Sequence, residues 1–138
     1  MRRPTLPIFV LLAAPTVVAM TLAGAPRVAA QAPDAAAHKQ WMNDASDAQE
    51  DYRFAVTDKD QKAAVDALGK LESLMARTED YWRAKKSEAG VKLSQAARTS
   101  AAQALAAAKR GDLAAASAPF DAMGASCNAC HELHLETK

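Results

Sequence analysis

Residues 111–134 read "GDLAAASAPFDAMGASCNACHELH", and their spacing predicts the structural class of the chain. Seven side chains of this stretch recur at alternating steps of three and four: Leu113, Ala116, Phe120, Met123, Cys127, Cys130 and His134. Such steps place side chains on one face of an α-helix, so the buried face of this helix continues into a C-x-x-C-H run. Gly111 and Asp112 predict the end of one helix and the N-cap of the next. Pro119 predicts a kink or a restart within the stretch.

The preceding residues are also helical in character. They are rich in Ala, Lys, Glu, Gln and Leu, poor in β-branched residues, and free of an alternating strand pattern or an internal repeat. Apolar spacing predicts three further helices, at about 35–56, 59–85 and 91–110. Thr57 or Asp58 is the predicted N-cap of the second of them. Four amphipathic helices with short connections predict an all-α fold, an up-down-up-down four-helix bundle.

Each of these three helices has an inward face. The first carries His38, Met42, Ala45, Gln49, Tyr52 and Val56, with Trp41 beside them. The second carries Val65, Leu68, Leu71, Met75 and Trp82. The third carries mostly small residues, Val91, Ala97, Ala101, Ala104, Leu105 and Ala108. Small side chains let helices approach closely, or they leave room for something bulky.

The beginning of the chain differs from the rest in composition. Two arginines are followed by an apolar run from Leu6 to Leu22, and small residues lead up to Ala30. This order predicts a cleavable signal peptide at 1–30 and a four-helix-bundle domain at 31–138. Two prolines in the run favour cleavage over an uncleaved membrane anchor. The sequence therefore predicts a periplasmic or otherwise exported protein.

Net charge argues against a nucleic-acid partner. Residues 1–30 hold three arginines and no acidic residue, so their removal lowers the 17 basic side chains to 14 against 16 acidic ones, a formal charge of −2. No basic face follows from this balance, and we expect no nucleic-acid binding. In an oxidising compartment, the two cysteines are expected to be paired or captured by a cofactor.

The C-x-x-C-H run is the strongest functional signal in the chain. On a helix, Cys127, Cys130 and His131 stand at i, i+3 and i+4, so their side chains project from one side. This spacing is the signature of covalent haem attachment, in which two thiols add to the haem vinyl groups and the histidine coordinates iron. An export signal agrees with that chemistry. We therefore expect one covalent haem c.

Two other interpretations of the run remain. Cys127, Cys130, His131 and His134 could form a Cys₂His₂ zinc site, but structural zinc sites usually take two ligand pairs from separate elements. A redox-active dithiol needs its C-x-x-C at a helix N-terminus in a βαβ setting, whereas this run lies near a helix C-terminus in a chain without visible strands. Both interpretations fit the spacing less well than haem attachment does.

The chain resembles the cytochrome c′ family. The resemblance rests on the final helix: a Gly-Asp-Leu start, a central Phe, a Met-Gly pair and then Ser-Cys-x-x-Cys-His, all within residues 111–134. It implies a haem lodged in a four-helix bundle, with Cys127 and Cys130 as attachment points and His131 as proximal iron ligand. Over the first three helices the resemblance rests on pattern, length and position only.

The resemblance also implies that the first helix forms the distal side of the haem. In the family, an apolar residue early in that helix, often Leu or Met, faces the iron, and Met42 is the matching candidate here. If its sulfur binds, the iron is six-coordinate and its potential is raised, which suits electron transfer. If Met42 only packs there, the iron is open to small gases. His38 lies one turn earlier, at the helix start, where we expect a surface position.

The chain departs from the family at two points. In the family, an aromatic residue often stands three positions after the haem histidine, and a basic residue follows it. Here His134 and Leu135 occupy these positions. We expect His134 to be a surface residue or a residue that contacts an iron ligand. The part of the chain after residue 30 is also shorter than typical family members, so the connections between helices are tighter. The subunit pairing seen in the family therefore need not occur here.

The predicted function is that of an exported monohaem c-type cytochrome, a one-electron carrier working with redox partner proteins. No pair of side chains resembles an activated nucleophile with its base, so we do not expect an enzyme. The main alternative is a five-coordinate haem protein that binds NO or CO, and a zinc-stabilised helical module is the second alternative. A homodimer is the expected assembly if the family's pairing carries over.

Overall fold

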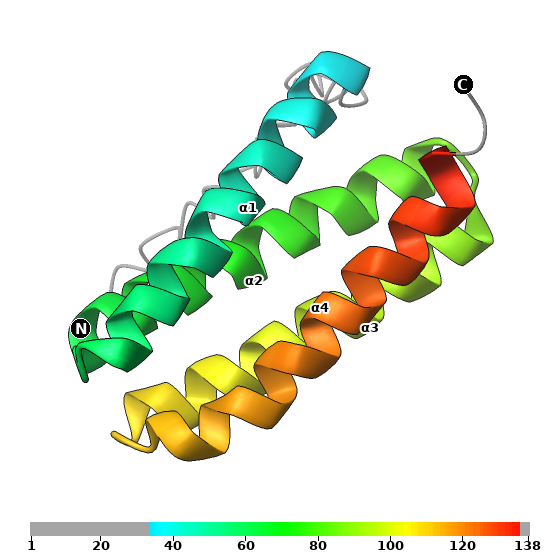
Figure 1. Cartoon of the computed structure of the whole chain (residues 1–138). Coiled ribbons are helices and arrows are strands. Elements are labelled where there is room, and N and C mark those ends of the chain that lie inside the picture. Colours follow the sequence, from blue (N-terminus) through cyan, green and yellow to red (C-terminus); the bar gives the residue numbers. More distant parts are fainter. Residues whose placement is uncertain (1–33, 136–138) are drawn as a thin grey trace, which may run out of the picture. The chain divides into compact units, whose positions relative to one another are not determined.

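A computed structural model of the chain describes residues 34–135, and the predicted signal peptide at 1–30 lies outside the described residues. Four helices run up, down, up and down: α1 (Ala35–Thr57), α2 (Gln61–Ala84), α3 (Glu88–Lys109) and α4 (Leu113–Leu135) (Figure 1). The prediction of an all-α four-helix bundle is confirmed. Within the described residues, no helix combines the length and the hydropathy that crossing a bilayer requires.

The three connections repeat one local structure. Each has a residue at positive φ, namely Lys59 (55°), Lys86 (56°) and Gly111 (82°), directly before the N-cap of the next helix. The N-cap backbone N–H of each connection bonds five residues back, as when Asp112 donates to the Ala107 carbonyl at 3.1 Å. This is the Schellman arrangement, which uses the carbonyls left free at a helix end. The end of one helix and the start of the next are therefore joined by only three residues, so consecutive helices run antiparallel.

The N-caps correct two predicted boundaries. Asp60, rather than Thr57 or Asp58, caps α2, and its carboxylate accepts from the Ala63 N–H at 2.9 Å. Ser87 caps α3, which starts three residues earlier than predicted, at Glu88. In both places the chain needs a left-handed residue before the cap, so the cap lies one residue after that turn.

α4 is continuous through Pro119, so of the two predicted alternatives, a kink or a restart, the restart is wrong. Proline at this position removes one N–H, and the carbonyl that loses its partner belongs to Ala115. Ala115 is exposed, so water can satisfy that carbonyl.

The core combines a few large side chains with many alanines. Leu68, Leu71 and Met123 are its largest fully buried side chains, and Tyr52 and Phe120 are buried beside them. Four residues of the predicted small-residue face of α3 are buried, Ala97, Ala101, Ala104 and Ala108. The alanine face lets α3 pack closely against both of its neighbours, α2 and α4.

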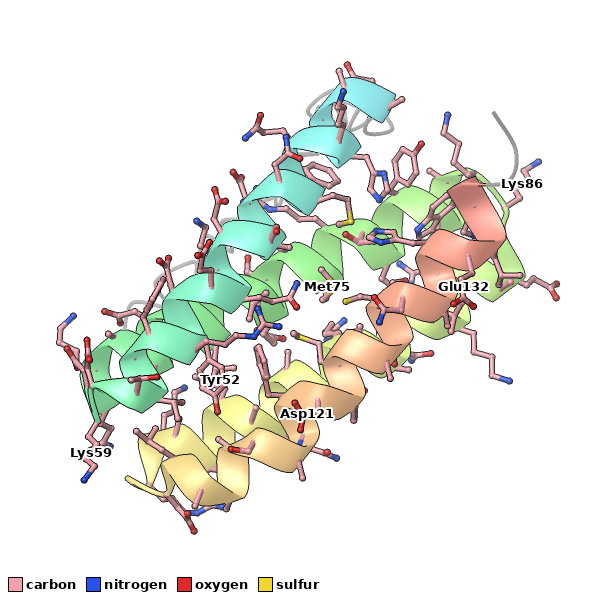
Figure 2. All side chains as sticks on the ribbon, viewed as in Figure 1. Tyr52, Lys59, Met75, Lys86, Asp121 and Glu132 are labelled. Carbon is pink, nitrogen blue, oxygen red and sulfur yellow. The ribbon has the colours of Figure 1, made fainter. Side chains whose placement is uncertain are left out.

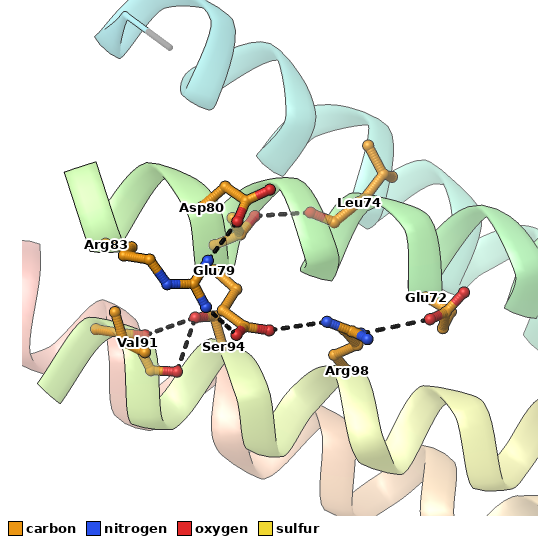
Figure 3. A network of polar contacts seen from close by, with 10 residues as sticks. Glu72, Leu74, Glu79, Asp80, Arg83, Val91, Ser94 and Arg98 are labelled. Atoms are coloured by element: carbon orange, nitrogen blue, oxygen red, sulfur yellow. Dashed lines mark hydrogen bonds and ion pairs between the residues drawn. The ribbon is translucent and has the colours of Figure 1, made fainter. Parts of the chain in front are cut away.

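One buried charge ties α2 to α3. The Glu79 side chain is 7% exposed and pairs with Arg83 on its own helix and with Arg98 on α3, at 3.0 Å for the latter (Figure 3). Arg98 also approaches Glu72, at 3.5 Å. Two guanidinium partners compensate the burial of this carboxylate, whose isolation would be costly.

Candidate functional site

The C-x-x-C-H run occupies the last turns of α4. Cys127 and Cys130 are free thiols, and both are half-buried. Cys127 packs against the hydrophobic core, whereas His131 is exposed. The helix places the three residues on one side of α4, as their spacing predicted. The run therefore borders the core at one end of the bundle.

Burial keeps both thiols protonated. Burial raises the pKa of Cys127, and the neighbouring Cys130 adds to this. Burial also raises the pKa of Cys130, while the indole N–H of Trp82 partly opposes the change. A redox-active dithiol works through a lowered thiol pKa, so these surroundings do not suit that chemistry.

An aromatic contact fixes the level of α1 relative to α4. The rings of Tyr52 and Phe120 have centroids 4.3 Å apart. Figure 2 shows Tyr52 directed from α1 toward the part of α4 that carries Asp121. Counting ten positions from this contact, toward the start of α1 and the end of α4, reaches Met42 and Cys130. Because both helices rise by about 1.5 Å per residue, Met42 lies level with Cys130 and its neighbour His131. Met42 is half-buried and packs against the core.

Aromatic rings close this end of the bundle. His38 stacks on Tyr81, with centroids 4.0 Å apart and an interplanar angle of 1°. Trp82 stacks on His134 at 3.9 Å and meets His38 edge-on at 5.4 Å. We call these four residues the ring cluster. It joins α1, α2 and α4 around the C-x-x-C-H run.

The ring cluster corrects the expectation for His38. Its ring is half-buried against Tyr81, not at the surface, because α1 is capped by Asp34 and is already regular at this residue. Burial lowers the pKa of His38, and the charges of His131 and His134 contribute in the same direction. The imidazole is therefore neutral at pH 7. Its Nε2 is buried and has no hydrogen-bond partner among the described residues.

α1 and α4 are in less contact than any two consecutive helices. Extensive contacts join α1 to α2, α2 to α3, and α3 to α4, whereas the pairing of α1 with α4 that would complete a regular bundle is not among them. The Tyr52–Phe120 contact bridges the two helices, and a surface hollow of about 300 Å³ lies beside it, reaching from Arg53 to Ser117. The boundary between α1 and α4, which we call the α1–α4 seam, runs from this hollow to the cysteines.

The predicted zinc ligands do not converge. Among the described residues, no three histidine, cysteine, aspartate or glutamate side chains come together in a way that could hold a metal ion. His134 instead stacks on Trp82.

No family model, no curated protein and no solved structure matches this chain. The site therefore rests on its own residues. Periodicity placed Met42 and both cysteines on inward helix faces but missed Tyr81, which is adjacent to Trp82 and falls outside the face that the steps of three and four defined. A pair of adjacent aromatic residues near a helix end was the available signal.

Proposed function

We propose that this protein is an exported monohaem c-type cytochrome that transfers one electron between partner proteins. The observation that carries the proposal is the C-x-x-C-H run on one side of α4, with two free, half-buried thiols beside the α1–α4 seam. The residues present suit a haem. Two thiols at i and i+3 are available for thioethers, apolar side chains border them, and α1 and α4 make fewer contacts across the seam than any two consecutive helices make.

Each residue of the site has a separate role in this proposal. Cys127 and Cys130 hold the haem covalently, and His131 is the proximal iron ligand. Met42 is the candidate distal ligand, because it is level with His131 on the opposite helix. The bound haem supplies the one-electron chemistry. The side chains between α1 and α4 exclude water, and a thioether ligand raises the reduction potential relative to a second imidazole.

Covalent attachment is tested by denaturing electrophoresis with haem staining. The mature protein, made in cells that assemble c-type cytochromes, is expected to retain a stained band. The Cys127→Ser/Cys130→Ser variant is expected to lose that band, while Asn128→Ser, which keeps the C-x-x-C-H run, retains it. A stained band in the double variant would overturn the attachment.

The second candidate function is gas binding by five-coordinate iron. It is favoured by the packing of Met42 against the core, which lets this side chain act as a wall rather than a ligand. The absorption spectrum of the reduced protein, recorded before and after adding carbon monoxide, separates the two functions. A low-spin spectrum unmoved by the gas, which becomes gas-sensitive in Met42→Ala, supports electron transfer. A high-spin spectrum that shifts on adding the gas supports gas binding.

Export is part of the proposal. A periplasmic or other exported location, with residues 1–30 as a cleaved signal peptide, agrees with covalent haem assembly. N-terminal sequencing of the secreted protein tests it, and a chain that still begins at residue 1 contradicts cleavage. The zinc-stabilised module is separated by metal analysis, because a colourless protein holding zinc would replace the haem proposal.

A further inference from the structure

Trp82 joins more helices than any other side chain of the ring cluster. It extends from α2, stacks on His134 of α4 at 3.9 Å with an interplanar angle of 19°, and meets His38 of α1 edge-on at 5.4 Å. It also lies against Tyr81 at 5.0 Å. Two of these contacts are long-range in sequence, so they restrain the relative positions of α1, α2 and α4 rather than one helix alone.

α3 accommodates Trp82 with a glycine. A Cβ on Gly90 would lie 2.6 Å from both Cγ and Cδ2 of the indole, which is closer than real carbon atoms approach. Gly90 is buried in the first turn of α3. Gly69 on α2 and Gly124 on α4 differ, because a Cβ on either would meet nothing within 4 Å. The glycine at position 90 is therefore required by the tryptophan, whereas the other two are not required by packing.

The indole N–H of Trp82 belongs to the ring cluster, which lies around the C-x-x-C-H run. Nε1 of Trp82 is buried, and no acceptor lies within hydrogen-bond range of it among the described residues. A buried indole N–H usually has a partner, so this donor is held in an unusual place.

We propose that Trp82 is a positioning residue of the haem site, which holds the end of α4 through His134 and keeps a buried indole N–H without a protein acceptor at this end of the bundle, with Gly90 providing the space. This inference rests on the proposed function. Trp82 acts on the iron in two ways. It fixes the level of Cys130 and His131 relative to Met42, and it places the positive end of a dipole next to the cofactor. Such a dipole stabilises the reduced iron, which has the lower positive charge.

The first test separates the N–H from the ring. Trp82→Phe keeps an aromatic ring against His134 and removes only the indole N–H and part of the ring area. In the holoprotein we expect a lower reduction potential with nearly the same thermal midpoint. A purely structural tryptophan would change the thermal midpoint without moving the potential. An unchanged potential in Trp82→Phe overturns the role of the N–H.

The second test moves the ring without changing it. Gly90→Ala places a Cβ against the indole, so we expect a shifted potential and a partial loss of the low-spin spectrum. Gly69→Ala is the matched control, and we expect neither change. In a Trp82→Ala background, Gly90→Ala is expected to have no further effect on the potential. If Gly90→Ala alters only the thermal midpoint, or acts equally in both backgrounds, the positioning role is wrong.

These outcomes are distinct from failure of the proposed function. If the wild-type protein carries no covalent haem, the cytochrome proposal itself fails, and the potentials cannot be defined. If it carries haem and all variants share one potential and one spectrum, the cytochrome proposal stands and the role of Trp82 is rejected.

Discussion

The protonated thiols of Cys127 and Cys130 give a prediction for the haem-free chain. Because burial raises the pKa of both thiols, the thiolate fraction at pH 8 is lower than in the unfolded chain. Alkylation with iodoacetamide, followed by mass spectrometry, should be several-fold slower in the folded protein than in urea. The difference should shrink as the pH rises through the raised pKa values. Reduced glutathione serves as the control for the intrinsic reaction. Faster alkylation in the folded state would instead indicate an activated dithiol.

Burial differs sharply between two leucines, of which helical spacing places only Leu68 on an inward face. Leu68 is fully buried at 0% exposure, whereas Leu133 is 53% exposed. Leu68→Ala removes core contacts and leaves a cavity, so the free energy of unfolding should fall by about 2–5 kcal/mol. Leu133→Ala should change it by about 0.5 kcal/mol or less. Urea unfolding of the two variants measures both values. Equal losses would mean that Leu133 is covered in solution.

At the scale of an element, a Gly→Ala substitution is expected to change the stability in opposite directions in a connection and inside a helix. Gly111 has a φ of 82°, which alanine adopts only with strain, so Gly111→Ala should lower the stability by about 1 kcal/mol. Gly69 lies inside α2 with open space around its Cα, so Gly69→Ala should raise the stability by about 0.5–1 kcal/mol. Thermal unfolding of both variants checks the opposite signs. A gain at Gly111 would contradict the left-handed turn before α4.

The helices themselves could be predicted because each is amphipathic along its own sequence. Caps were harder, since Asp58 and Asp60 are equally suitable and only the left-handed Lys59 selects the second. The C-x-x-C-H run could be placed on one side of a helix by spacing alone. The contact of His38 with Tyr81 could not, because it depends on how α1 and α2 are rotated about their own axes. Periodicity within a helix carries no information on that rotation.

The burial of the Glu79 carboxylate could not be predicted from the sequence for the same reason. Glu79 is polar and lies next to an exposed Asp80, so its sequence suggests a solvated face. Its burial depends on Arg98, which lies nineteen positions away on α3. A partner at that distance is not part of any helical repeat.

In the whole molecule, the contacts between helices are unequal, and a bound cofactor is expected to add most protection against local opening where these contacts are fewest. α2 and α3 each pack against two neighbours, whereas α1 packs extensively only against α2, and α4 only against α3. Regions with fewer buried contacts open locally at lower free energy than the rest of a fold. In the haem-free chain, α1 is therefore expected to be the least protected helix, because its one extensive pairing, with α2, is smaller than the pairing of α4 with α3.

Covalent haem between α1 and α4 should increase the protection of α1 more than that of the other helices. A group held by Cys127 and Cys130 and touched by Met42 would bind only the closed arrangement of the two helices, and binding to the native state alone stabilises it. Hydrogen–deuterium exchange of the holoprotein, compared with the haem-free Cys127→Ser/Cys130→Ser variant, should show the largest gain of protection in the first half of α1. The alanine-rich middle of α3, around Ala101 and Ala104, is the internal control and should change least. Equal gains in α1 and α3 would mean that haem stabilises the bundle globally and does not act through the α1–α4 seam.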